Sequence, residues 1–596
     1  MATCRVGFMA TSACPVQRER RLRERRVRLI PPRASTSSNN NGPANKFSMD
    51  RRDVLLGLGG AAAAATVMTP GGVILPAMAN PVAPPDLSKC HIATQGAPSG
   101  EDKCCPPYSM AEIIDYDFPR TPLRVRRPAH EVKEDTDYMN KYREAVKKMK
   151  ELKSDHPWNF YQQALVHCAY CNGAYDQVGY PGVALQVHYS WLFLPWHRYY
   201  LHFFERILGK LIDDDTFTLP YWNFDVKEGM TMPEIFTSDE NSPLYNKNSR
   251  NKDHYHPKLL DYRYGYKAGS GSNASSDDEL VQLNMSYMRS TFKNSMQLPE
   301  LFMGDPLRAG EPDSSGKGSG GLEGIHNGIH QFVGPTTNPH TDMGNFATAA
   351  RDCMFYSLHA NVDRLWHLYR NFRGNRVEFN EPDWLDASFV FYDEHERVVR
   401  VKVKDCLTPT KLRYTYEEVP IPWMGSIKVQ KTKETKRKQD LNLVRISEFG
   451  TQPREIGTTP LRVMVPRPKA NRRKKDKEEK VELLQIKDIQ VASHGPARFD
   501  VFVAAPYGDL AGPDFGEFVG SFVKLPHKTT TEEGNNGVAK HNGKKTNLKL
   551  GLTALLEDIE AEDAEKLVVT IVPAGGDVTI GGIQLKLVQA DSPRLH

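Results

Sequence analysis

Three histidines fall within one short, aromatic stretch of the chain. His167 opens the sequence His-Cys-Ala-Tyr-Cys, His188 lies in Leu-Gln-Val-His-Tyr, and His197 lies in Leu-Pro-Trp-His-Arg. A structural zinc site would need a second Cys or His pair at similarly short spacing, and none lies nearby. A redox Cys-x-x-Cys would need a βαβ setting, which these surroundings do not favour. The three imidazoles are therefore a candidate metal site.

A second group of histidines follows further along the chain. His326 and His330 are four positions apart, so on a helix their rings project from one face and can share an ion. In a chain with 19 histidines such a pair also arises by chance. His359 supplies a third imidazole from residues 351–366, which have the pattern of an amphipathic helix.

The ligand types in these two sets of histidines limit which metal ion can bind. Neither set contains a carboxylate, which favours a late first-row transition metal over magnesium or calcium. Copper held by neutral imidazoles cycles between two oxidation states, and two such ions together can bind O₂. The residues therefore predict a pair of copper ions.

The elements around the histidines are expected to be helices. Pro195 can begin a helix, and residues 196–208 carry apolar and aromatic side chains at helical spacing. His197 would then lie in the first turns of that helix.

The last third of the chain has a different pattern. At 596 residues the chain is too long for one core, so two domains are expected. After a lysine-rich stretch at 428–438, short apolar alternations predict strands of a small β-sandwich. These strands are expected at 462–465, 481–486, 499–503, 566–571 and 583–587. The lysine-rich residues 425–457 are predicted to be an exposed, cleavable linker, and residues 469–480 a solvated hairpin loop.

The N-terminal segment has the composition of a targeting signal. Residues 1–79 carry a net charge of +8 within a chain of +5, so the rest is slightly acidic and offers no basic surface for nucleic acid. Residues 1–47 are Arg- and Ser-rich, as in an organelle transit peptide. Residues 48–79 contain Arg51-Arg52, an apolar run and Ala77-Met78-Ala79, which is typical of a twin-arginine export signal.

These two signals in series predict delivery to the chloroplast thylakoid lumen. Pro70, Gly71, Gly72 and Pro76 interrupt the apolar run, so no transmembrane anchor is expected. Peripheral association with the thylakoid remains compatible with this prediction.

The histidine motifs together resemble one known family. The segments H-C-A-Y-C, L-Q-V-H, L-P-W-H-R, H-N-G-I-H and F-Y-S-L-H-A-N-V-D-R-L-W are similar to those of plant polyphenol oxidases, the catechol oxidase and tyrosinase group of coupled dicopper proteins. The resemblance extends to Pro382–Asp386, Phe391–Glu394, Tyr414 with Tyr416, and Arg498–Val501.

The resemblance implies a role for each of these residues. One copper would be held by His167, His188 and His197, and the other by His326, His330 and His359. Cys171 would form a thioether with His188, and Phe346 would be a gate over the second copper. The implied disulfides are Cys90 with Cys105 and Cys104 with Cys168. Asp363 and Arg364 are expected to form a structural ion pair behind the site.

The sequence departs from the family pattern at Leu358, Cys353 and Glu323, and it lacks the proline that the family has ahead of the second cluster. Leu358 stands where the family has a histidine, and Cys353 where it has a proline. Glu323 is three residues before His326 instead of four, although Asn327 is present. In hydroxylating members this Glu and Asn are thought to hold a water that helps deprotonate a monophenol. A displacement of one position is about 100° around a helix, so monophenol hydroxylation is in doubt.

The expected fold is a mainly α catalytic domain over residues 80–424, a four-helix bundle around a dicopper centre, followed by a C-terminal β-sandwich domain over 458–596. The expected activity is oxidation of o-diphenols (catechols) by O₂, with reduction of O₂ to water, latent until the C-terminal domain is removed by a protease or displaced. The alternatives are tyrosinase-type monophenol hydroxylation, a specialised pigment-forming oxidase, and a non-catalytic oxygen-binding dicopper protein.

Overall fold

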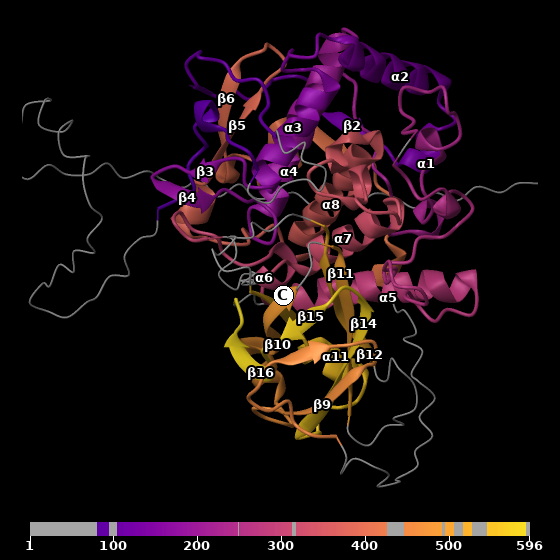
Figure 1. Cartoon of the computed structure of the whole chain (residues 1–596), viewed down its shortest axis with the longest axis vertical. Helices are drawn as coiled ribbons and strands as arrows, with labels where there is room; N and C mark the ends of the chain where they lie inside the picture. The colour runs from indigo at the N-terminus through magenta and orange to yellow at the C-terminus, as the bar shows by residue number, and fades with distance from the viewer. Residues whose placement is uncertain are drawn as a thin grey trace, which may run out of the picture. The chain divides into compact units, whose positions relative to one another are not determined.

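The computed structural model describes residues 80–93, 104–247, 249–312, 318–425, 446–491, 495–505, 517–526 and 545–591 (Figure 1). The chain divides into two compact units, Met1–Pro76 and Ala77–His596. The two targeting signals and residues 426–445 of the expected linker lie outside the described residues. All of the described residues belong to the second unit, Ala77–His596.

The part of this unit before residue 425 is mainly helical (Figure 1). Its α-helices are α1 (Ala129–Val132), α2 (Thr136–Glu151), α3 (Phe160–Cys171), α4 (Phe193–Leu211), α5 (Asp277–Ser295), α6 (Glu300–Met303), α7 (Gly321–Val333), α8 (Cys353–Phe372) and α9 (Pro382–Leu385). Short 3-10 helices lie at Leu87–Lys89, Lys227–Gly229, Glu234–Phe236, Lys252–His254, Asp342–Gly344, Ala349–Arg351, Val403–Asp405, Pro409–Leu412 and Pro422–Met424.

Two polar caps determine where histidine-bearing helices begin. The Asn159 side chain accepts from the Tyr161 N–H at the start of α3, and the Asp352 carboxylate accepts from the Met354 N–H at the start of α8. Such caps satisfy N–H groups that have no partner within the helix. Helices α4 and α8 are buried on nearly every face, which is typical of helices in the core of a large domain.

Short strands join distant parts of the helical region. They are β1 (Ile114–Asp115), β2 (Arg124–Arg126), β3 (Asp176–Gln177), β4 (Tyr180–Ala184), β5 (Ser388–Tyr392), β6 (Val398–Lys402) and β7 (Tyr414–Tyr416). Strand β2 pairs in parallel with β7, and β1 pairs in parallel with β6. The beginning and the end of the helical region are therefore held together by backbone hydrogen bonds.

The C-terminal region is rich in β-sheet. It comprises β8 (Arg454–Ile456), β9 (Leu461–Pro466), α10 (Lys474–Glu479), β10 (Lys480–Val491), β11 (Ala497–Ala504), β12 (Glu517–Lys524), β13 (Thr546–Gly551), α11 (Thr553–Asp558), β14 (Lys566–Gly575), β15 (Val578–Ile580) and β16 (Gly582–Gln589). One sheet has the order β12-β11-β14-β9 and the other β13-β10-β15-β8, with β16 also paired to β10. Apolar residues of both sheets form one core.

The five predicted strands lie within β9, β10, β11, β14 and β16. Residues 469–480 are mostly exposed, as predicted, but the hairpin loop was wrong, because residues 474–479 form α10 and the preceding strand β9 pairs with β14 and not with β10. Lysines and glutamates alternate there at helical spacing, which favours a helical turn over a loop. Strand β8 lies in the stretch expected to be linker.

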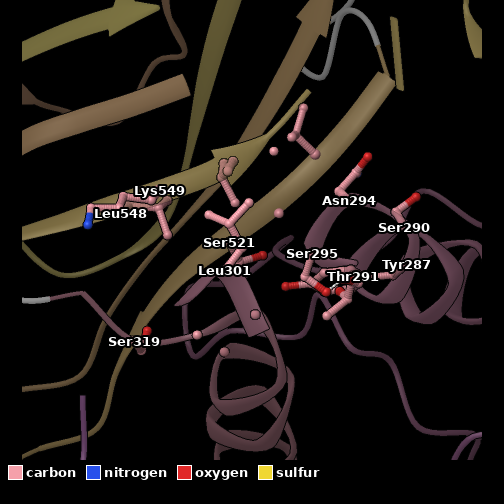
Figure 2. A pocket seen from close by; sticks show the side chains of 17 residues that line it. Tyr287, Ser290, Thr291, Asn294, Ser295, Leu301, Ser319, Ser521, Leu548 and Lys549 are labelled. Atoms are coloured by element: carbon pink, nitrogen blue, oxygen red, sulfur yellow. Dashed lines mark hydrogen bonds between the residues drawn. The ribbon is translucent and has the colours of Figure 1, made fainter. Parts of the chain in front are cut away.

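The C-terminal sheets pack directly against the helical region. Strand β12 lies against α5 and α7, and four ion pairs cross the junction at 2.6 to 2.9 Å. These pairs are Lys549–Asp305, Lys293–Asp558, Arg263–Asp500 and Arg373–Asp591. Figure 2 shows the junction, where side chains of α5 face Ser521 of β12 and Leu548 of β13 around a cavity of about 30 Å³. At this point the two regions leave room for little more than a water molecule, whereas Tyr266, Lys267 and Gln331 face Arg498 and Ala574 across a wider hollow of about 500 Å³.

A buried carboxylate links the two helices that carry His197 and His359. Asp363 on α8 accepts from the Arg198 Nε at 2.5 Å and from the Tyr414 hydroxyl at 2.6 Å. It also accepts from the Tyr416 hydroxyl and lies 3.5 Å from Arg126 Nη1. Burial alone raises the pKa of Asp363, but these two guanidinium groups and two hydroxyls lower it below its ordinary value.

The predicted ion pair between Asp363 and Arg364 was therefore wrong. Arg364 pairs with Asp225 at 3.1 Å, while Asp363 faces Arg198. Consecutive residues on a helix point about 100° apart, so adjacent opposite charges rarely face each other.

We expect Asp363→Ala to lower the free energy of unfolding of the helical region by about 3–5 kcal/mol, because it leaves Arg198 buried without its carboxylate. The measurement is the denaturant midpoint followed by tryptophan fluorescence. Asp115→Ala is the matched control, since Asp115 pairs with Arg400 at the surface, where such pairs often contribute nothing measurable. Equal midpoints for the two variants would contradict the structural role of Asp363.

Candidate metal centre

The first histidine cluster is assembled from two helices and a loop. His167 is on α3, His197 is on α4, and His188 lies in the segment between β4 and α4. Ligand atoms of these three residues and of Cys171 all lie within 4.8 Å of one another. The three histidine side chains are only 1–2% exposed. The structure thus brings together the three residues that the spacing suggested.

The second cluster lies on two further helices. His326 and His330 are on α7 and His359 is on α8, with ligand atoms again within 4.8 Å. The Nε2 atom of His326 is 2.9 Å from the Nε2 of His330 and 2.9 Å from the Nε2 of His359. The i, i+4 spacing therefore places both α7 rings on one face, as expected.

Carbonyl oxygens orient the rings in both clusters. The Nδ1 of His197 donates to the Phe193 carbonyl at 2.8 Å, and the Nδ1 of His330 donates to the Met343 carbonyl at 2.6 Å. The Nδ1 of His326 faces the Asn327 side-chain oxygen at 2.9 Å. A hydrogen atom on Nδ1 leaves the lone pair on Nε2, which is the form that binds a metal.

This geometry suits a shared cation. In the neutral rings of His326 and His330 both Nε2 atoms carry lone pairs, and two lone pairs 2.9 Å apart repel each other. In the first cluster, both ring nitrogens of His188 and the Nε2 of His197 are buried without a hydrogen-bond partner. Each such atom costs about 1–3 kcal/mol unless something satisfies it. A cation bound to each cluster would remove both penalties.

The surroundings keep the imidazoles neutral. Burial lowers the pKa of all six histidines, to about 3 for His197 and about 4 for His330. Neutral imidazole is the ligating form, and a set of three imidazoles without a carboxylate suits a late transition metal. The residues present therefore fit two copper ions.

The two clusters are adjacent. The rings of His197 and His359 stack with centroids 4.2 Å apart and an interplanar angle of 10°. The Phe193 ring lies 4.7 Å from His197 and 5.0 Å from His326, and the Phe355 ring lies 4.8 Å from His167 and 4.2 Å from His359. Both rings therefore contact both clusters and exclude water from between them.

Sequence analysis missed these two phenylalanines. Each precedes a cluster histidine by four positions, Phe193 before His197 and Phe355 before His359. Residues four apart on a helix are neighbours, so the spacing contained a signal that could have found them.

Phe346, the expected gate, is buried beside the first cluster. Its ring centroid lies 4.3 Å from that of His188 and 6.4 Å from that of His330. The ring therefore packs more closely on a histidine of the first cluster than on one of the second.

The cysteines fix the segment around the first cluster. The structure contains the Cys90–Cys105 and Cys104–Cys168 disulfides, and the second of these attaches the N-terminal segment to α3. Cys171 is a buried thiol in this structure. Gln186 donates to the Cys171 carbonyl and accepts from the His188 N–H, which holds the His188 loop against the end of α3.

Glu323 connects the two clusters through the backbone. Both of its carboxylate oxygens accept from the Tyr189 N–H, at 2.9 and 3.1 Å, next to His188 in the chain. Tyr189 has a φ of 58°, a left-handed conformation that is costly for this residue type and is maintained by such contacts. Burial raises the pKa of Glu323 to about 8.

Asn327 contacts both a histidine and the C-terminal region. Its Oδ1 faces His326, and its Nδ2 donates to the Val523 carbonyl on β12 at 3.2 Å. The atypical Leu358 and Cys353 are both buried.

Three other histidines, His202, His340 and His367, lie outside both clusters. His202 bonds to the Tyr116 hydroxyl at 2.9 Å, and His340 stacks on Tyr266. His367 lies on α8 beside Asn371. His527 lies outside the described residues.

Three family models match successive parts of the chain. The common central domain of tyrosinase matches residues 157–372, the polyphenol oxidase middle domain matches 378–428, and the chloroplastic polyphenol oxidase C-terminal domain matches 453–587. Both histidine clusters fall within the first match.

Individual relatives are similar over nearly the full chain. A chloroplastic polyphenol oxidase of Vitis vinifera is 43% identical over 98% of this chain and 95% of its own. Aureusidin synthase of Antirrhinum majus is less similar, at 40% identity over 85% of this chain and 89% of its own, so a pigment-forming role is not favoured.

Solved structures of a tyrosinase and a polyphenol oxidase are also similar to this chain. A latent apple tyrosinase superposes with a TM-score of 0.71 at 42% identity, covering 80% of this chain and all of that one. A Grenache (Vitis vinifera) polyphenol oxidase superposes with a TM-score of 0.54 at 46% identity, covering 58% of this chain and all of that one. Among the described residues, none of the helices combines the length and the apolar character needed to cross a bilayer.

We expect the copper-free protein to lose stability as the pH rises from about 4.5 to about 8, in part through Glu323. Its pKa is raised on folding, so the neutral carboxyl favours the folded state below 4.5, and that advantage is lost once the pH passes about 8. Glu323→Gln keeps an oxygen for the Tyr189 N–H but cannot ionise. The thermal midpoint of this variant, measured from pH 5 to 9, should therefore fall less than that of the parent. Parallel curves would show that Glu323 does not titrate in this range.

Proposed function

This chain belongs to the plant polyphenol oxidases, and from that membership we propose that its two histidine clusters hold a pair of copper ions that oxidise o-diphenols. Polyphenol oxidases are oxidoreductases that act on phenols with O₂ in a copper-dependent reaction, and they include latent forms. The observation that carries the proposal is the pair of adjacent, fully buried sets of three imidazoles.

We assign His167, His188 and His197 to one copper and His326, His330 and His359 to the other. Bound copper would supply the redox chemistry, passing electrons from the phenol to O₂. Two o-diphenols would each lose two electrons and two protons to become o-quinones, and one O₂ would become two waters. The four helices α3, α4, α7 and α8 would act as a bundle around the pair.

The protein's own residues would keep this chemistry selective. The carbonyl anchors of His197 and His330 fix ring orientation, so less reorganisation is needed when the metal changes oxidation state. The rings of Phe193 and Phe355 close the sides of the site, and Phe346 would restrict access from beside His188. Exclusion of water protects a reactive quinone from side reactions.

Cys171 is proposed to form a thioether with a ring carbon of His188. Forming this bond removes the thiol hydrogen and a ring hydrogen, a two-electron oxidation for which the site's copper and O₂ are the oxidant. Gln186 already holds the two residues' backbones close together. The bond would fix the one ligand that comes from a loop and not from a helix.

Oxidation of o-diphenols is favoured over hydroxylation of monophenols. A monophenol must lose its proton with help from a base, and Glu323 is occupied by the Tyr189 N–H. In the copper-free protein, burial also raises the pKa of Glu323 to about 8. A catechol needs less assistance, because its first hydroxyl is more readily deprotonated at a metal.

We further propose that residues 458–596 act as a shield and that a protease cuts within 425–457. Among the described residues, the six histidines are 0–2% exposed and β12 lies against α7, which supports a shielding role for the C-terminal region. The predicted leader, residues 1–47 and 48–79, would deliver the protein to the chloroplast thylakoid lumen, with peripheral membrane association possible there. Its relatives in Vitis vinifera and Malus domestica are named chloroplastic.

Copper content tests the ligand assignment directly. The copper-loaded chain should hold two copper atoms, and His359→Ala should hold one, because two imidazoles retain the second ion poorly. His367→Ala is the matched control, since His367 lies on the same helix outside both clusters and should leave two. Loss of copper from both variants, or from neither, would contradict the assignment.

Oxygen uptake tests the activity and its latency. We expect the intact copper-loaded chain to consume little O₂ with catechol, and the chain cut by limited proteolysis to consume it rapidly. Tyrosine, offered separately, should give slow or no uptake, because Glu323 is displaced by one position from the family pattern and bonds to the Tyr189 N–H. Rapid uptake with tyrosine would overturn the assignment to o-diphenols, and no uptake with either substrate would favour an oxygen-binding protein without turnover.

A further inference from the structure

A single side chain connects the C-terminal domain to a copper ligand. Asn327 Nδ2 donates to the backbone carbonyl of Val523 on β12 at 3.2 Å, and Asn327 Oδ1 lies 2.9 Å from His326 Nδ1. All three residues are buried. We call this chain of contacts, Val523–Asn327–His326, the docking link.

The docking link determines the protonation of His326. A backbone carbonyl only accepts hydrogen bonds, so the Val523 oxygen requires the amino group of the Asn327 amide to face it. The amide oxygen must then face His326, and an oxygen accepts only from a protonated Nδ1. A neutral His326 with its proton on Nδ1 has its lone pair on Nε2, facing His330 and His359.

The hydrogen-bond partner of Nδ1 differs between His326 and the two other anchored histidines, His197 and His330. His197 and His330 donate from Nδ1 to backbone carbonyls of the helical region itself, Phe193 and Met343. Those two carbonyl groups stay in place whether the C-terminal domain is docked or released. The anchor of His326 is a side-chain amide that can rotate once the Val523 carbonyl is gone.

We propose that the docked C-terminal domain holds His326 in its ligating tautomer through Asn327, so that release of the domain loosens the second copper site. Asn327 is thus a positioning residue whose orientation is set by the other domain. This inference rests on the proposed copper ligation, and it assigns the C-terminal domain a role at the metal beyond covering the site.

A neighbouring residue provides a matched control. Gln331 is one turn further along α7, and its Nε2 lies 3.5 Å from the Lys524 carbonyl on the same strand. Among the described residues, no hydrogen bond joins the Gln331 side chain to a histidine of either cluster. Gln331→Ala therefore disturbs the same junction without touching a ligand.

The test measures the rate of copper loss to a chelator. The copper-loaded full chain is compared with the same chain after limited proteolysis and separation from the C-terminal domain, and copper atoms per chain are counted over time. The Grenache polyphenol oxidase structure is matched over its whole length by 58% of this chain, so a relative keeps its fold without a counterpart of the rest. The quantity of interest is the ratio of the rates for cut and intact protein.

In the parent chain we expect one of the two copper atoms to be lost about 10-fold faster after cutting, the effect typical of losing an outer partner of a ligand. In Asn327→Ala that copper should be lost rapidly in both forms, giving a ratio near one. Asn327→Asp keeps an acceptor for His326 without needing Val523, so it should restore retention and also give a ratio near one. Gln331→Ala should behave like the parent.

Other outcomes overturn the inference. If cutting merely gives the chelator access, both copper atoms will be lost faster and Asn327→Ala will show the parent's ratio. If the parent's ratio is near one, the docking link does not act on the metal. If the intact chain fails to bind two copper atoms, the ligand assignment itself fails, which the copper count reveals before any rate is compared.

Discussion

Six imidazoles must remain neutral and convergent in the interior of this protein, and most of its polar architecture follows from that requirement. Buried imidazoles without partners are costly, and two lone pairs 2.9 Å apart repel each other. A shared cation would remove these costs, and each ring must also be prevented from turning away. Backbone carbonyls of Phe193 and Met343 prevent rotation of two rings, while packing against Phe193 and Phe355 restricts others.

Rigid placement of rings requires rigid placement of helices. Asp363 follows His359 by one turn on α8 and Arg198 directly follows His197 on α4, so their buried ion pair clamps the two helices just behind the stacked rings. The same carboxylate accepts from two tyrosines of β7, which pairs with β2. The beginning and end of the helical region are thereby tied to the metal-bearing helices, a coupling that an apolar core alone would not give.

Much of the fold and of the candidate metal site could be predicted from the sequence. The predictions that failed did so for physical reasons. The i, i+4 spacing on α7 and the strands of the C-terminal region depend on local periodicity, which is visible in the residues themselves. His188 lies in a loop whose path depends on Gln186 and on the left-handed Tyr189, and no periodicity reports such a path. The partner of Asp363 was mistaken because charge adjacency in sequence is not adjacency on a helix. Glu323 was recognised as displaced, but its contact with the Tyr189 N–H depends on tertiary structure.

Helix α7 explains why ligation and docking are difficult to separate in this chain. His326 and His330 occupy one face, and Asn327 and Gln331, about 100° further around, contact β12. Gly328 completes the docking side, since a Cβ there would lie 3.0 Å from the Tyr262 carbonyl and 3.2 Å from Arg498 Nη1. The segment His-Asn-Gly-Ile-His therefore contributes to the candidate metal site and to the interface at once. Coupling between two sites is reciprocal, so if docking strengthens copper binding at His326, copper must strengthen docking by the same free energy. The copper-loaded chain would then hold its C-terminal domain more firmly than the copper-free chain. Latency would therefore be strongest in the copper-loaded form, which is the form that can oxidise phenols.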